Sequence, residues 1–126
     1  MKVTTYESAM NHWKNGYLAW NPKKYSYYKK NFYIGLSVSE DSNVHPFYYD
    51  TDNEIEDRSI TYEGIPMIYN SHIFKPIYCY YIKISSKETL DNLTESVYND
   101  MIMDFEHKIK QYKIKNKIDA LSKDFE

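Results

Sequence analysis

Residues 73–84 read IFKPIYCYYIKI, and the rest of the chain can be arranged around this stretch. From Ile77 onward, Ile, Tyr and Cys fill nearly all positions, so both faces of an extended segment would carry side chains that favour strands. Pro76 has no N–H to donate and therefore belongs at the beginning of a strand or at a bulge. The stretch predicts a central strand of a β-sheet.

A long helix is predicted directly after this strand. Ser85 and Glu88 have the spacing of a capping box, in which two side chains satisfy free backbone donors of the first helical turn. The apolar stripe shifts to the opposite side after Tyr112, which favours a break within residues 113–117 and a separate short helix at 117–125. The alternative is one unbroken helix, whose last part would form a partner or homodimer surface. The stripe before the shift consists of Leu90, Leu93, Val97, Met101, Phe105, Ile109 and Tyr112.

The N-terminal part of the chain predicts a shorter helix. Thr4 and Glu7 repeat the capping-box spacing, and apolar residues follow at helical intervals. A helix over residues 5–14 is therefore expected. Asn15-Gly16 would end it, because these residues are common just past a helix C-terminus. The aromatic segment that follows is expected to be a turn or an irregular segment.

Two further strands are predicted downstream of this helix. Residues 34–38 alternate large apolar and small residues, which is typical of a half-buried strand. Residues 47–49 are rich in aromatic side chains and predict a short strand. The polar residues 40–46 between them are expected to form a turn.

A hairpin is predicted just before the central strand, with residues 59–62 paired to 65–69 around Glu63-Gly64. The predicted fold class is therefore α+β. It comprises an N-terminal helix, an antiparallel sheet of four or five strands, and a long C-terminal helix packed on one face of the sheet. With 126 residues, we expect a single domain over residues 1–126.

Composition excludes several classes of protein. No apolar run is long enough for a signal peptide or a membrane span, so a cytoplasmic protein without membrane contact is expected. The single cysteine, Cys79, cannot form an internal disulfide or a cysteine-based zinc site, and its place in a central strand predicts a buried position. No cofactor or metal is expected.

Charge is divided along the chain. Residues 1–33 contain six Lys and one Glu, for a net charge of +5. Residues 40–63 contain eight Asp or Glu and one Arg, for a net charge of −7. Two regions of opposite sign on a chain of net charge −2 would create local fields that the overall charge conceals.

The acidic region suggests a partner-binding patch. An EF-hand calcium loop beginning at Asp50 is excluded, because Ile55 stands where glycine is needed and Thr61 where a bidentate Glu is needed. The remaining readings are a solvated loop or a surface that docks onto a basic partner, for which opposite charge would raise the association rate. The candidate patch consists of Tyr48, Tyr49, Asp50, Asp52, Glu54, Glu56 and Asp57.

The basic region suggests a different function. Alternating Lys and Tyr residues can bind single-stranded nucleic acid, because the cations neutralise the backbone and the rings stack on bases. The other reading is a solvated strand edge, and the near absence of Arg weakens the case for phosphate recognition. The candidate nucleic-acid-binding residues in segment 23–33 are Lys23, Lys24, Tyr25, Tyr27, Tyr28, Lys29 and Lys30.

Catalysis has little support in the sequence. The chain lacks a nucleophile elbow, a P-loop and a dinucleotide-binding motif, and it has only three glycines. A small hydrolase or nuclease would have to use His45, His72 or His107 with a nearby carboxylate such as Asp104. We therefore expect a protein that is not an enzyme.

The leading hypothesis is a small non-catalytic protein that binds a basic protein surface through its acidic, tyrosine-rich patch. Fifteen Lys against one Arg, with frequent Tyr, indicates a gene of low GC content. This favours a phage or mobile-element inhibitor of a host enzyme, in particular one that binds nucleic acid. A single-stranded nucleic-acid-binding module is the alternative, and a hydrolase or nuclease is the third hypothesis.

Overall fold

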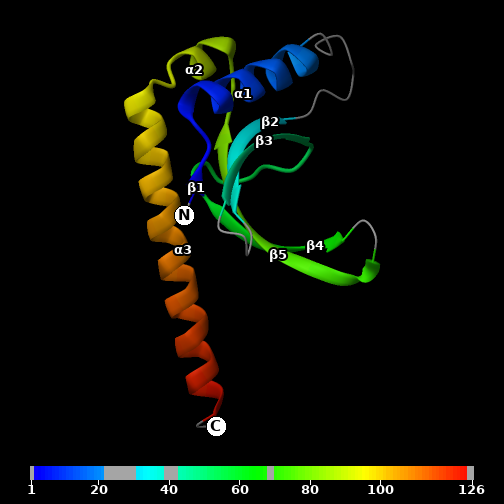
Figure 1. Ribbon diagram of the computed structural model, residues 1–126, viewed down its shortest axis with the longest axis vertical. Helices are drawn as coiled ribbons and strands as arrows, with labels where there is room; N and C mark the ends of the chain where they lie inside the picture. Colours follow the sequence, from blue (N-terminus) through cyan, green and yellow to red (C-terminus); the bar gives the residue numbers. More distant parts are fainter. Residues whose placement is uncertain (1, 22–30, 39–42, 68–69, 125–126) are drawn as a thin grey trace. The chain divides into compact units, whose positions relative to one another are not determined.

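The computed structural model describes the backbone of residues 2–21, 31–38, 43–67 and 70–124. Side chains are described for the same residues apart from 63–76 and 116–124. The fold class is α+β, as predicted, with an N-terminal helix, a five-stranded sheet and a long C-terminal helix (Figure 1). The elements in chain order are β1 (Lys2–Val3), α1 (Tyr6–Trp20), β2 (Asn31–Val38), β3 (Asn43–Thr51), β4 (Ile60–Met67), β5 (Asn70–Lys83), α2 (Lys87–Asp91) and α3 (Glu95–Asp124).

The chain divides into two compact units, Met1–Thr94 and Glu95–Glu126. The first contains the whole sheet with α1 and α2, and the second is α3. Within the described residues, no helix is long and apolar enough to cross a membrane.

The sheet has the strand order β1-β3-β2-β5-β4. Neighbouring strands are antiparallel except for β1, which pairs parallel to β3 through Lys2 with Asn43 and Val3 with Val44. The sheet is therefore mixed rather than wholly antiparallel. β2 lies at its centre, and β5 lies between β2 and β4, so the central position predicted for residues 73–84 is confirmed where β5 pairs with β2.

Helix α1 begins where a capping residue satisfies its first turn. Thr5 is the N-cap, and its hydroxyl accepts a hydrogen bond from Ser8 N at 3.3 Å. The predicted end at Asn15-Gly16 is wrong, because α1 continues to Trp20 and includes the segment expected to be irregular. Gly16 lies inside the helix, where a Cβ would stand 2.4 Å from the ring of Tyr48.

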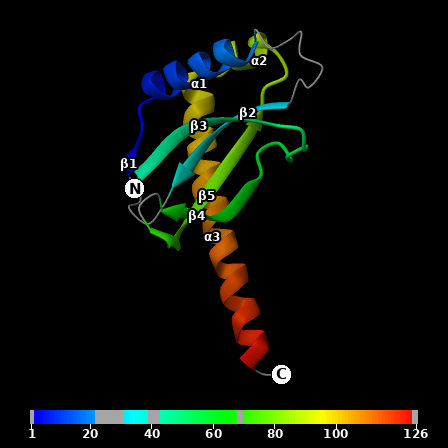
Figure 2. The ribbon, with the colours of Figure 1, turned by 90° about the vertical axis from the view of Figure 1, so that its right-hand side faces the viewer.

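Helix α1 packs on one face of β2 and β3, and both ribbon views show it lying over these strands (Figure 1, Figure 2). Trp13 is fully buried and donates its Nε1–H to Gly35 O at 3.2 Å. The rings of Tyr17 and Trp20 lie 5.8 and 5.2 Å from the ring of Phe32 on β2. These aromatic contacts form the core between the helix and the sheet.

Strands β4 and β5 form a longer hairpin than the sequence predicts. β4 continues through Glu63-Gly64, and Gly64 pairs with Pro76, so a turn at that dipeptide is wrong. The connection lies at residues 68–69, outside the described residues. Pro76 is tolerated inside β5 because β2 pairs only with residues 78–83, so that ladder needs no N–H from Pro76.

Strand β3 also begins earlier than predicted. It starts at Asn43, so half of the segment expected to be a turn is strand. Val44 is buried and pairs with both Val3 and Val38, and its carbonyl accepts a hydrogen bond from Thr4 Oγ1 at 2.7 Å. Neighbouring strands on both sides therefore extend β3 beyond its aromatic centre.

The helical part of the chain after β5 is interrupted at residues 92–94, between α2 and α3, and not at the predicted residues 113–117. Ser86, one residue after the predicted cap, caps the short helix α2 through Thr89 N at 3.3 Å, and α2 ends at Asp91 with Asn92 as its C-cap. α3 then runs from Glu95 to Asp124 without a break. The break predicted at 113–117 and the separate helix at 117–125 are therefore wrong, since no Gly or Pro in that segment interrupts the helix.

Helix α3 buries part of the stripe that its periodicity predicts, whereas Val97 and Tyr112 are half-buried. Met101, Phe105 and Ile109 are buried, and so is Tyr98, which the predicted stripe did not include. Burial raises the pKa of the Tyr98 hydroxyl above its ordinary value, because the charged form would lose hydration. Beyond the shift of the stripe, Ile114 is 59% exposed.

Candidate functional site

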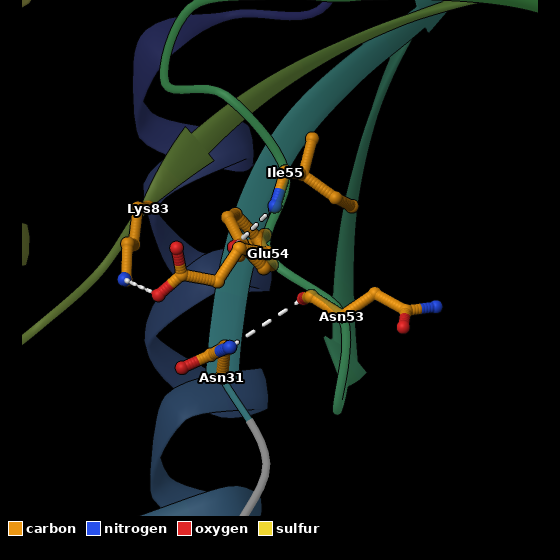
Figure 3. A network of polar contacts seen from close by, with 6 residues as sticks. Asn31, Asn53, Glu54, Ile55 and Lys83 are labelled. Carbon is orange, nitrogen blue, oxygen red and sulfur yellow. Dashed lines mark hydrogen bonds and ion pairs between the residues drawn. The ribbon is translucent and has the colours of Figure 1, made fainter.

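The segment between β3 and β4, residues 52–59, carries most of the predicted acidic patch and is called the acidic loop here. Its first half is fixed to β2 and β5 (Figure 3). Asn31 Nδ2 donates to Asn53 O at 3.4 Å, and Ile55 N donates to the Tyr33 hydroxyl at 2.8 Å. Lys83 Nζ lies 3.5 Å from Glu54 Oε1. Side chains of two strands therefore hold the start of the acidic loop.

The second half of the acidic loop is bonded to β5. Asp57 Oδ1 accepts a hydrogen bond from Lys83 N at 3.1 Å. Arg58 N donates to Tyr81 O at 2.8 Å, and Tyr81 N donates to Ser59 O at 3.1 Å. Arg58 adopts a positive φ of 59°, which few residues other than glycine occupy, so the surrounding bonds define its backbone. The path of the loop is therefore set by side chains of β2 and β5 at its start and by main-chain bonds to β5 at its end.

The carboxylates of the acidic loop remain accessible. Asp52, Glu54, Glu56 and Asp57 are exposed, and Asp50 at the end of β3 is half-buried. The Glu54 side chain is 81% exposed even though it pairs with Lys83, so this ion pair leaves most of its surface in water. The predicted acidic residues are therefore gathered in one continuous segment with an ordered backbone.

The two tyrosines of the predicted patch lie on opposite faces of the sheet, because successive strand residues alternate in direction. The Tyr48 ring lies against Gly16 and 5.0 Å from the His12 ring, on the side of α1. Tyr49 pairs with Tyr33 and lies on the other side. The candidate patch is thus divided, since the Tyr48 ring lies on the α1 face of the sheet and Tyr49 lies on the opposite face.

A pocket of about 510 Å³ lies on the sheet face opposite to α1. The face is identified by alternation: Phe32 packs against α1, whereas its neighbour Tyr33 packs against Tyr81 with ring centroids 6.3 Å apart. This pocket is not among the sites predicted from the sequence. Its lining residues are Ser37, Phe47, Tyr48, Tyr49, Thr51, Asn53, Ile55, Thr61, Ile77, Cys79 and Tyr81.

The walls of the pocket are mainly apolar. Tyr81 meets Phe47 edge to face, with centroids 5.3 Å apart, and Ile55 and Ile77 pack around the same cluster. Gly35 makes room for Phe47, since a Cβ at Gly35 would lie 2.4 Å from the tip of that ring. The small residues Gly35 and Ser37 on the central strand are the one sequence signal near the pocket, and they do not locate it without the strand order.

The predicted nucleic-acid-binding residues, Lys23, Lys24, Tyr25, Tyr27, Tyr28, Lys29 and Lys30, lie outside the described residues. The structure therefore does not place the basic segment relative to the acidic loop, and the separation of the two charged regions stays a prediction.

The histidines are not brought together with a catalytic partner in the described part of the chain. His45 is exposed on β3, where it pairs with Ser37 of β2. Ser37 pairs in turn with Cys79 of β5, and His72 lies seven residues before Cys79 on that strand, so His45 and His72 are not neighbours in the sheet. On α3, Asp104 Oδ2 lies 3.1 Å from Lys108 Nζ, and His107 is exposed. The described residues also contain no group of three or more His, Cys, Asp or Glu side chains arranged to hold a metal ion.

The chain was also compared with known proteins. No protein-family model matches it, and searches of curated proteins and of solved structures returned no match.

Proposed function

We propose that this protein acts by binding a positively charged surface of another protein through its acidic loop. One observation carries the proposal: Asp52, Glu54 and Glu56 are exposed on a loop whose backbone is bonded to β2 and β5. A loop that is already ordered loses less conformational entropy when it binds than a disordered acidic segment would. Its charge would also accelerate encounter with a cationic partner.

The finer form of the proposal concerns the partner's identity. A row of carboxylates is complementary to a basic groove that binds nucleic acid. The acidic loop and a nucleic-acid backbone both present closely spaced negative charges to such a groove. The protein would then act as an inhibitor, encoded by a phage or mobile element, that occupies such a groove on a host enzyme. Competition between this protein and nucleic acid for the partner would be the expected behaviour.

The proposal is tested by neutralising the loop without changing its fold. The variant Asp52→Asn, Glu54→Gln, Glu56→Gln retains the backbone bonds and leaves Asp57 in place. We expect its affinity for a fluorescent decalysine peptide, measured by anisotropy at low salt, to fall about tenfold, since each exposed pair contributes up to about 1 kcal/mol.

A matched control removes the same three charges elsewhere, by Asp91→Asn, Asp100→Asn and Glu106→Gln. It should reduce decalysine affinity by no more than about twofold, because the proposal assigns cation binding to the acidic loop and this variant changes only the net charge. Equal losses in the two variants would show that net charge, and not the acidic loop, attracts the cation, and the proposal would be rejected.

A further inference from the structure

We propose that the pocket on the sheet face is an anchor site for one large apolar side chain, carried by the basic protein segment that the acidic loop attracts. This inference rests on the proposed function and adds the feature that the partner segment must contain. The occupant is thus a lysine- or arginine-rich segment with an aromatic or long aliphatic residue among its cations.

The acidic loop belongs to the pocket as well as to the charged surface. Asn53 and Ile55 line the pocket, whereas Asp52, Glu54 and Glu56 are exposed. Pocket-lining residues, the amide Asn53 and the apolar Ile55, therefore alternate with carboxylates along one segment of chain. A partner segment that places an apolar side chain in the pocket would bring its neighbouring cations next to these carboxylates, so charge complementarity selects a basic occupant.

The pocket suits a large side chain in size and chemistry. Its volume of about 510 Å³ falls within the range of roughly 300–1,000 Å³ that is usual for ligand pockets. Phe47, Tyr81 and Ile77 provide aromatic and aliphatic contact surfaces. Aromatic side chains in such pockets supply much of the binding energy in protein interfaces, and the surrounding polar contacts supply specificity.

The backbone bonds of the acidic loop hold this arrangement together. The Tyr33 hydroxyl accepts from Ile55 N at 2.8 Å, which places the Ile55 side chain among the buried residues Tyr33, Cys79 and Tyr81. Lys83 N and Asp57 fix the other side of the loop. The charged rim and the apolar wall are therefore in place before a partner arrives, which lowers the entropy cost of binding.

Two labelled heptapeptides test the inference, one with tryptophan between lysines, KKKWKKK, and one with alanine in its place, KKKAKKK. We expect the tryptophan peptide to bind the wild-type chain at least tenfold more tightly by fluorescence anisotropy. The amide signals of Cys79 and Tyr81 should shift in NMR spectra when the tryptophan peptide is added, and shift much less with the alanine peptide.

Substitutions then assign the preference to the pocket. Ser37→Phe fills the hollow from β2 and should reduce the preference for tryptophan below about twofold without changing the affinity for KKKAKKK. Ser8→Phe makes the same change at an exposed position of α1 and should retain the full preference. If Ser37→Phe retained the preference, or if Cys79 and Tyr81 did not respond in the wild type, the pocket would not be the anchor site.

The remaining outcomes separate this inference from the proposed function. Binding of both peptides with equal affinity, abolished by neutralising Asp52, Glu54 and Glu56, would overturn the anchor site and leave the proposed function standing. If neither peptide bound, both proposals would fail. If an uncharged GGGWGGG peptide bound as tightly as KKKWKKK, the pocket would serve an apolar ligand independently of the loop, and the inference would be rejected.

Discussion

Gly16 allows α1 and β3 to approach closely. A Cβ at this position would lie 2.4 Å from two ring atoms of Tyr48, which is too short for any real contact. Gly16→Ala should therefore destabilise the protein by about 1–3 kcal/mol, the usual cost of overpacking. Alanine is otherwise the better helix former by about 0.5–1 kcal/mol, so the sign of the change is informative.

Urea unfolding of a double-mutant cycle checks this prediction. In the background of Tyr48→Ala the ring is absent, and Gly16→Ala should then stabilise the protein by about 0.5–1 kcal/mol. If Gly16→Ala changed the free energy of unfolding with the same sign in both backgrounds, the Tyr48 ring would not be the reason for glycine at position 16.

The error at Gly16 in the sequence analysis has a physical reason. Glycine after asparagine indicates a helix end because glycine readily adopts positive φ. Gly16 instead has ordinary helical backbone, and its missing side chain is used for space. A single sequence does not distinguish these two uses, because the ring that needs the space comes from a strand far along the chain.

At the scale of the elements, the Tyr33 hydroxyl is one of the groups that hold the acidic loop. Tyr33→Phe retains the ring in the core and removes the acceptor for Ile55 N, which lies 2.8 Å away. We expect a loss of about 0.5–1.5 kcal/mol in the free energy of unfolding, the usual net value of one hydrogen bond. Amide hydrogen exchange at Ile55 should accelerate selectively.

Exchange at a position outside the loop is the control for this variant. The amide of Ile84, which donates to Phe32 O at 2.9 Å, should show only the change expected from the global loss of stability. Unchanged exchange at Ile55 would mean that the Tyr33 hydroxyl does not hold the loop.

Local patterns predicted the elements well and their ends poorly. The alternation in β2, the dense β-favouring residues of β5 and the stripe of α3 indicate element type directly. The ends of the elements depend on the pairing of strands that are distant in the sequence. β4 passes through Glu63-Gly64 because β5 pairs with it there, and α3 continues past residue 113 because a shift in the stripe changes its exposed side without weakening its backbone bonds.

For the molecule as a whole, the positions of the acidic residues along the chain could be read from the sequence, whereas the pocket could not. The acidic residues lie close together in the sequence, at positions 50, 52, 54, 56 and 57, so the sequence alone indicates them. The pocket is assembled from Ser37, Phe47, Thr61 and Ile77 on four different strands, so strand order and register had to be known before it could be recognised.

The two charged regions lead to opposite expectations for nucleic acid. If the acidic loop dominates, the intact protein should bind a labelled twenty-nucleotide oligothymidine no better than the weakest non-specific binders, with a Kd above about 100 μM at physiological salt. The measurement is anisotropy against salt concentration. Tight binding that weakens steeply with salt, and that disappears when Lys23, Lys24, Lys29 and Lys30 become Gln, would favour the single-stranded nucleic-acid-binding module instead.

The wall of the pocket also contains a chemical reporter. Cys79 is the only cysteine in the sequence, and it is 6% exposed at the pocket wall. An occupant of the pocket would screen its sulfur further, so the alkylation rate of this one thiol by a small maleimide would decrease as the pocket fills. Unlabelled wild-type protein could therefore be screened for occupants by mass spectrometry alone.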